Sequence, residues 1–461
     1  MDQFYWICME QIVILIVYNF LFFWKIWINP FTISRSELLS TFYPSWLYIG
    51  RQLRQSKSWK HEPCYWLNFH AHPVLSSYYP PHVITSWIAS FLNLDDAFVL
   101  LTHTILAHFI WMSLGWYFLL NISYTSIPLL IFGALTLTYS GYNIKQQPCI
   151  VYTISWFPWL LYGIASNNVF IASLSCGMTF LSGYYPLGIQ TLGISGLASL
   201  LWGWNLLWVP VGILIGLPQL IPFLRYLPKT IRTVQSELVS VGFWEKAFFP
   251  GTPVFFLIWF STSRVWPLLV IGSILALGVG QKCLPRISHR WLFTVQFCLG
   301  WMAVSGLANL SIPAGATYAL VILQGFSLYI VNSSLIPTLP YAELWNRPSR
   351  AFKTRITAFL EAHLDPNNRV SGLPYPIFTG LINGFKTLGY SGGMQLKLMA
   401  KWRNDTNPNG SGEHDYFKRN SDGEAVDRAR VQFAFTSSKL DWQSTSVPRL
   451  WCNPRLQSIP S

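Results

Sequence analysis

The chain has 461 residues, of which 52% are hydrophobic and only 11% are charged. Soluble domains average about a quarter charged residues, so this composition excludes an ordinary soluble enzyme and favours a polytopic membrane protein. The formal net charge of +13 comes without a basic-aromatic module. It therefore favours anionic lipid or a lipid phosphate as the partner, and not nucleic acid.

The first part of the chain, residues 1–337, reads as a membrane domain. Its opening apolar stretch is too long for the hydrophobic core of a signal peptide and lacks a small-residue cleavage site, so we expect a retained helix. A bilayer core of about 30 Å takes about 20 helical residues, which predicts about eleven transmembrane helices. The predicted spans are residues 5–27, 95–120, 126–143, 148–166, 168–183, 186–203, 205–224, 252–263, 264–281, 291–310 and 314–337.

Residues 338–461 are richer in charge and read as a water-facing tail. The segment Ser349 to His363 carries its apolar side chains on one face, which predicts an amphipathic helix. Two β-like runs follow at residues 369–373 and 430–436. The predicted fold class is therefore mainly α, a helical membrane domain followed by a small C-terminal α/β domain.

A polar loop, residues 29–79, lies between the first two predicted spans and gathers ten ionisable side chains in about fifty residues. After Asp96 no acidic residue occurs until Glu237, and Lys145 is the only basic residue before Arg225. We therefore expect the chemistry of the protein in this loop. Its ionisable residues are Arg35, Glu37, Arg51, Arg54, Lys57, Lys60, His61, Glu62, His70 and His72.

Glu37 is the only carboxylate in the first half of this loop, and it has two interpretations. A carboxylate near a membrane surface can act as the general base that takes a proton from an acceptor hydroxyl. The run Ser34-Arg-Ser-Glu37 also has the S-x-x-E spacing of a helix capping box. The two roles are compatible, and the sequence leaves both open.

Two further groups in this region have a functional and a structural interpretation. His70 and His72, with His61, Glu62 and Cys64 nearby, supply ligand types that divalent metals use, but no pair has standard zinc spacing. The Asp95-Asp96 pair fits a metal or phosphate site, or the first turn of a helix where carboxylates favour the helix dipole. The seven cysteines contain no C-x-x-C pair and indicate neither a disulfide framework nor a zinc ribbon.

Ionisable residues at the predicted spans are few. His103 and His108 lie inside the second span, where an ionisable group is either functional or a neutral residue bonded to a neighbouring helix. Arg225, Lys229 and Arg232 follow another span at helical spacing and fit a lipid pyrophosphate or ordinary headgroups. No P-loop and no H-E-x-x-H motif occurs, so soluble-type ATPase chemistry has no support.

In order along the chain, several short motifs resemble those of the YfhO-type bacterial membrane proteins, relatives of the GT-C glycosyltransferases. The resemblance covers most of the chain, and the order of the motifs carries it. Here Glu37 stands where the family usually has Asp, and the chain ends soon after the last motif, so we expect a C-terminally shortened member. The matching motifs are Glu37 to Tyr43-Pro44, Asn68 to Pro73, Tyr78-Tyr79-Pro80, His108 to Leu120, Gly183 to Pro186, Gly216 to Pro222, Asn368 to Val370, Ile382 to Tyr390, Arg430 to Phe435 and Asn453-Pro454-Arg455.

The resemblance implies an inverting glycosyltransferase that moves a sugar from a polyprenyl phosphate to a cell-envelope polymer or lipid. Glu37 is the implied base, no specific cofactor is implied and a divalent metal is optional. For that metal, the ligand types in the loop make His70 and His72 the candidates. The side chains implied for substrate binding are Arg35, Arg51, Arg54, Tyr43, Tyr79, His108, Gln219 and Arg225.

The resemblance and the charge pattern disagree on orientation. The resemblance implies a bacterial plasma membrane protein with the loop and the tail outside the cell. The positive-inside rule, in contrast, places the basic loop in the cytoplasm. The rival function is a non-enzymatic flippase or transporter of a lipid-linked precursor, which would use His103, His108 and broken helices. A third interpretation, an assembly scaffold, would act through the tail.

Overall fold

The chain is mainly helical and divides into two compact units. The bundle unit comprises Met1–Ile33, Thr102–Leu217 and Gln235–Thr338, and the loop–tail unit comprises Ser34–Leu101, Pro218–Val234 and Leu339–Ser461. The computed structural model describes residues 2–32, 38–57, 71–72, 75–144, 146, 148–201, 203, 206–231, 250–262, 265, 269–270, 292–310, 312–333, 347–353, 355–364, 369–371, 382–383, 386–387, 395–396, 431–436 and 449–452.

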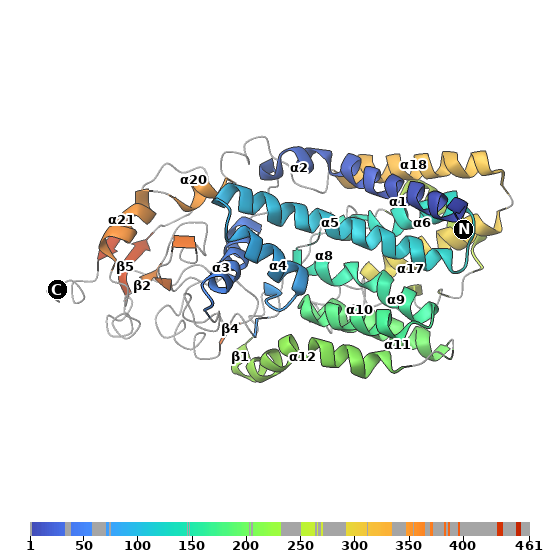
Figure 1. Cartoon of the computed structure of the whole chain (residues 1–461). Coiled ribbons are helices and arrows are strands. Elements are labelled where there is room, and N and C mark those ends of the chain that lie inside the picture. Colours follow the sequence, from blue (N-terminus) through green and yellow to red (C-terminus); the bar gives the residue numbers. More distant parts are fainter. Residues whose placement is uncertain are drawn as a thin grey trace. The chain divides into compact units, whose positions relative to one another are not determined.

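Long apolar helices make up the bundle unit (Figure 1). Among the described residues, five helical segments are long and apolar enough to cross a membrane, and three shorter apolar helices accompany them. The helices are α1 Asp2–Phe22, α2 Trp24–Ile28, α5 Leu94–Asn121, α6 Ile127–Thr138, α7 Gly141–Ile144, α8 Pro148–Ser155, α9 Phe157–Ala165, α10 Val169–Leu181, α11 Tyr185–Leu201, α12 Trp208–Tyr226, α14 Thr252–Leu257, α17 Leu292–Asn309 and α18 Ala314–Asn332. The loop–tail unit also contributes the first residues of α5 and the last residues of α12.

Several helices end earlier than the hydropathy pattern predicts, for local reasons. The span predicted at 126–143 stops at Thr138, because the Asn143 side chain donates to the carbonyls of Leu137 (2.9 Å) and Thr138 (3.1 Å). The span predicted at 148–166 is confirmed as the segment Pro148–Ala165, which has a one-residue break at Trp156 between α8 and α9. The span at 264–281 lies largely outside the described residues, and the total of eleven remains a prediction.

Helix α6 lies at the centre of the bundle unit, since every residue from Pro128 to Thr138 is buried. At its end, Tyr139 is fully buried and joins two other helices. Its hydroxyl accepts a hydrogen bond from the Asn19 amide of α1 (2.9 Å), and its carbonyl accepts one from Asn332 of α18 (2.8 Å). In a bilayer such uncharged pairs satisfy polar groups that find no water.

Helices α10 and α12 pack through glycine. A Cβ on Gly212 would lie 2.4 Å from the Cys176 sulfur, and one on Gly216 would lie 2.6 Å from the Cβ of Phe180. The G-x-x-x-G spacing therefore brings the two helices closer than larger side chains allow, as is common between membrane helices. Gly196 of α11, in contrast, has open space where its Cβ would be.

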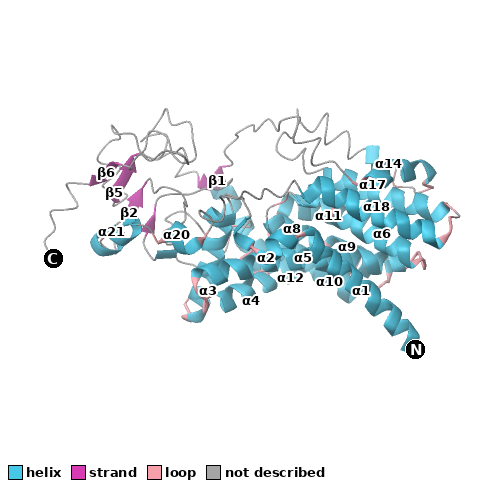
Figure 2. Cartoon of the chain, turned by 90° about the horizontal axis from the view of Figure 1, so that it is seen from above, coloured by secondary structure: helices cyan, strands magenta, loops and turns pink. Residues whose placement is uncertain are grey.

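The loop–tail unit contains a helical part and short strands, and Figure 2 shows the strands β2, β5 and β6 gathered near α21. Four strands form a sheet in the order β3-β2-β5-β6, in which β2 runs parallel to β3 and β5, and β6 is antiparallel to β5; β1 pairs with β4. The elements are η2 Leu38–Phe42, α3 Tyr43–Arg54, α4 Pro80–Ala89, α20 Pro348–Phe352, α21 Arg355–His363, β1 Thr230–Ile231, β2 Arg369–Ser371, β3 Lys386–Thr387, β4 Gln395–Leu396, β5 Val431–Thr436 and β6 Arg449–Cys452.

The single amphipathic helix predicted from Ser349 to His363 is wrong, because the structure breaks it into α20 and α21 at Lys353. The cause lies at the end of α20. Phe352 is buried, and its carbonyl accepts a hydrogen bond from the Asn383 amide (2.9 Å) instead of continuing a helix. Lys353 then pairs with Glu361 of α21 at 2.9 Å.

The glycine contact between α10 and α12 gives a stability prediction. Gly216→Leu should lower the thermal midpoint of the purified chain in detergent, because forcing a side chain into a filled contact costs about 1–3 kcal/mol. The matched control is Gly196→Leu, on α11, which should leave the midpoint nearly unchanged. Equal midpoints for the two variants would contradict the close packing.

Candidate functional site

The predicted chemistry falls in the loop–tail unit, where helices α3 and α4 pack side by side (Figure 1). Each helix begins at a tyrosine-proline pair, with Pro44 and Pro80 in the first turn, where proline is favoured. A Cβ on Gly50 of α3 would lie 1.8 Å from the Ser86 carbonyl oxygen of α4. Only glycine permits this approach, which sets the spacing of the pair.

Tyr43 is the meeting point of three parts of this unit. Its hydroxyl donates a 2.6 Å hydrogen bond to the Leu94 carbonyl at the start of α5, and its ring contacts those of Phe98 and Phe352. Burial raises the pKa of the Tyr43 hydroxyl well above its usual value, and the nearby Arg51 charge only partly offsets this. Tyr43 is therefore a neutral donor that organises the site.

Arg51, a predicted phosphate ligand, holds a tail residue. Its Nη1 donates to the carbonyl of Ile382 at 2.7 Å, across 331 residues of sequence. Burial lowers the pKa of the guanidinium, and the nearby Tyr43 acts in the opposite direction. This hydrogen bond from the half-buried Arg51 positions the tail beside the loop.

The other two described arginines from the prediction are exposed. Arg54 donates to the Ser90 carbonyl (2.9 Å), and its guanidinium lies 4.7 Å from the centre of the Phe91 ring. Arg225 lies in the last turn of α12. Both are accessible to an anionic group from solution or from a membrane surface.

The Asp95-Asp96 pair has the structural role that the sequence offered as one interpretation. Asp96 and Asn93 cap α5 reciprocally: the Asp96 amide donates to the Asn93 side chain (2.9 Å), and the Asn93 amide donates to the Asp96 carboxylate (2.7 Å). Asp95 accepts hydrogen bonds from the backbone and hydroxyl of Ser349, at 2.9 and 2.7 Å. The pair thus begins a helix and ties it to the tail.

His72 and Tyr79 are buried in the same unit. Burial lowers the pKa of His72 to about 4, so its imidazole is neutral near pH 7. A neutral imidazole is the form that binds metal. Within the described residues, however, no three His, Cys, Asp or Glu side chains lie close enough to hold a metal ion.

The remaining predicted residues lie in the bundle unit, in the part of α12 that belongs to the loop–tail unit, or outside the described residues. His108 is in the bundle unit, where its Nδ1 lies 2.7 Å from the Thr104 carbonyl oxygen and its ring packs on Tyr152. Gln219 is buried within α12. Glu37, Arg35 and His70 lie outside the described residues, although the chain resumes at Leu38, which is buried.

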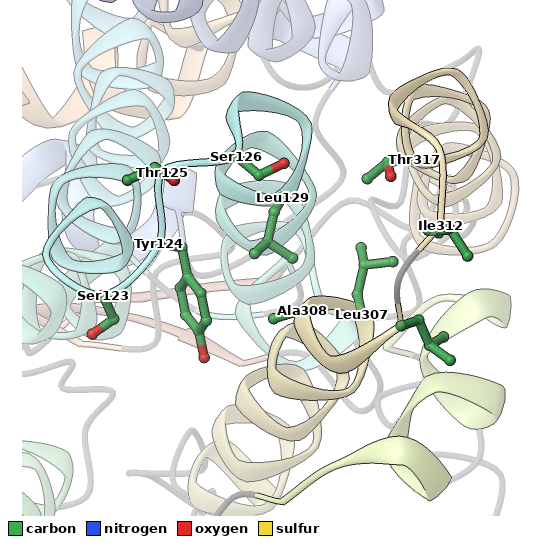
Figure 3. A pocket seen from close by; sticks show the side chains of 10 residues that line it. Ser123, Tyr124, Thr125, Ser126, Leu129, Leu307, Ala308, Ile312 and Thr317 are labelled. Atoms are coloured by element: carbon green, nitrogen blue, oxygen red, sulfur yellow. The ribbon is translucent and has the colours of Figure 1, made fainter.

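A cavity in the bundle unit offers a second location, shown in Figure 3. It has a volume of about 310 Å³ and lies between the α5–α6 connection and the α17–α18 connection. Its described lining carries hydroxyls but no carboxylate, imidazole or cation, so it lacks the groups that proton or phosphate chemistry needs. The lining residues are Ser123, Tyr124, Thr125, Ser126, Leu129, Leu307, Ala308, Leu310, Ile312 and Thr317.

The structure therefore brings together Tyr43, Arg51 and Asp95, with tail residues that sequence analysis did not single out. Asn93 was detectable, because an Asn three residues before Asp96 has the spacing of a helix cap. Ser349 and Asn383 carried no such signal, since their partners lie far away in sequence. No protein-family model matches the chain, and a search of the curated proteins finds no significant match.

The Asp95–Ser349 contact predicts a measurable coupling. In a double-mutant cycle of Asp95→Ala and Ser349→Ala, the free energy of unfolding should show an interaction of about 1 kcal/mol, the usual net contribution of a hydrogen bond. The neighbouring pair Asp96→Ala and Ser349→Ala is the control and should show none. A zero coupling in the first cycle would mean that the tail is not tied to α5 in this way.

Proposed function

We propose that the chain is an integral membrane glycosyltransferase that takes a sugar from a polyprenyl phosphate and transfers it to a cell-envelope polymer or lipid. One observation chiefly supports this. The predicted catalytic loop and the polar tail belong to the same compact unit, tied together through Tyr43, Arg51 and Asp95. A transferase of this kind needs a water-facing site next to lipid, with its ionisable groups gathered there.

In the proposed step an acceptor hydroxyl attacks the anomeric carbon from the face opposite the phosphate. The new carbon–oxygen bond forms as the bond from that carbon to the phosphate oxygen breaks. The hydroxyl proton passes to the carboxylate of Glu37, and the lipid phosphate leaves with the electron pair. Arg54 and Arg225 are exposed and are therefore better placed to bind that phosphate than Arg51. The Arg51 guanidinium is half-buried and donates a hydrogen bond to the Ile382 carbonyl of the tail.

The proposal extends to architecture and location. It takes the family's GT-C-like arrangement, about eleven membrane helices and a small α/β domain in the tail, from the resemblance. Because loop and tail share one compact unit, the proposal puts both on one side of the membrane, and the resemblance makes that side extracytoplasmic in a bacterial plasma membrane. A divalent metal is not required for the step as written.

Replacing Glu37 with Gln tests the chemistry. The variant should insert normally but transfer sugar at least about 10²-fold more slowly, the lower end of what a general base contributes. Transfer is measured in membrane vesicles as loss of radiolabel from a polyprenyl-phosphate sugar. Glu62→Gln, in the same loop, is the matched control and should keep its rate.

The same experiment distinguishes the transferase from the rival function, a carrier of the lipid-linked precursor. If Glu37→Gln transfers normally, the transferase mechanism fails. If the wild-type chain binds the labelled lipid without turnover, and His108→Phe abolishes binding while Glu37→Gln keeps it, the chain is a carrier of the lipid-linked precursor. His108 is the residue to test because it is a buried, ionisable side chain within a long apolar helix.

A further inference from the structure

Helix α4 has two faces of opposite character. One face is buried against α3 and carries His82, Ser86 and Ala89. The other face carries a row of large apolar side chains that remain exposed. They are Ile84 (58% exposed), Trp87 (48%), Ile88 (41%), Phe91 (56%) and Leu92 (41%).

The spacing of the exposed side chains makes them one surface. They fall at i, i+3, i+4, i+7 and i+8, the pattern of a single helical stripe about 100° wide. Phe91 and Leu92 lie just beyond α4 but continue its turn, because their amides donate to the carbonyls of Ile88 (3.1 Å) and Ala89 (3.0 Å). We call these five side chains the α4 stripe.

The short connection from α4 to α5 indicates what lies near the α4 stripe. Only four residues separate Ala89 from Leu94, where α5 begins, and an extended chain of that length spans at most about 17 Å. Helix α5 is 28 residues long, about 42 Å, which exceeds a bilayer core of about 30 Å. If α5 crosses the bilayer, one of its ends reaches the headgroup level, and the charged Asp95 and Asp96 in its first turn favour that end, near which α4 is held.

The edges of the stripe also fit a membrane surface. Trp87 is the residue type enriched where acyl chains meet headgroups. Arg54 lies at the stripe's end, with its exposed guanidinium over the Phe91 ring, where a cation can meet lipid phosphate. Because α5 is long and apolar enough to cross a membrane, lipid is a more direct occupant of the adjoining stripe than a soluble partner.

We propose that α4 is an interfacial helix, lying in the plane of the membrane with the α4 stripe among the acyl chains of the adjoining leaflet. This placement does not rest on the transferase function. Its consequence is positional: α3 packs on the opposite face of α4, so Tyr43 and the residues around it are held just above the lipid surface. A lipid-borne headgroup diffusing in that leaflet would meet this unit without leaving the membrane.

Nitroxide labels at single cysteines test the proposal in the full chain. The native cysteines are replaced, Ile84→Cys and Ile88→Cys are labelled separately, and the protein is reconstituted in vesicles of phosphatidylcholine and phosphatidylglycerol. Power saturation compares collision with oxygen, which concentrates in lipid, and with a water-soluble nickel chelate. Gln55→Cys, exposed at the end of α3, is the aqueous control, and Leu214→Cys on the exposed face of α12 is the lipid control.

Labels at 84 and 88 should match the label at 214, with an oxygen-to-nickel ratio several-fold above that at 55. A ratio equal to that of residue 55 places the stripe in water and overturns the proposal. Protection from both reagents means that protein covers the stripe, which overturns it as well. Two stripe positions are used so that one poorly folded variant does not decide the result.

Discussion

The loop–tail unit depends on the burial of one side chain, Tyr43. Its hydroxyl donates to the carbonyl at the start of α5, and its ring packs on Phe98 of α5 and Phe352 of the tail. Three segments far apart in sequence therefore share one residue that has no contact with water. The hydrogen bonds from Arg51 to Ile382 and from Ser349 to Asp95 add polar ties around this apolar centre.

The bundle unit follows the same physical rule with different groups. Tyr139 is fully buried and joins α1 and α18 through the amides of Asn19 and Asn332. Both units thus use a buried tyrosine, but the bundle pairs it with uncharged amides, whereas the loop–tail unit surrounds Tyr43 with Arg51 and Asp95. This difference fits a bundle in lipid, where charge is costly, and a second unit that meets water.

Hydropathy and composition predicted several of the long apolar helices but not their long-range ties. The apolar run of α5, the proline starts of α3 and α4, and the first-turn position of Asp95 all follow from local rules and agree with the structure. The break after Phe352 and the contact of Arg51 with the tail depend on partners tens to hundreds of residues away. A hydropathy profile describes one segment at a time and does not describe contacts between distant segments. Glu37, the residue on which the proposed chemistry depends most, lies outside the described residues.

The loop and the tail belong to one compact unit, and we propose that this unit lies on the outer face of the cell membrane. Labelling of Cys64 in the loop and Cys452 in the tail with a membrane-impermeant thiol reagent tests it most directly. Each is studied as the single remaining cysteine, in intact and in permeabilised cells. The account predicts that both are labelled in intact cells. Labelling of only one before permeabilisation would contradict the shared unit, and labelling of neither until permeabilisation would contradict the outside orientation.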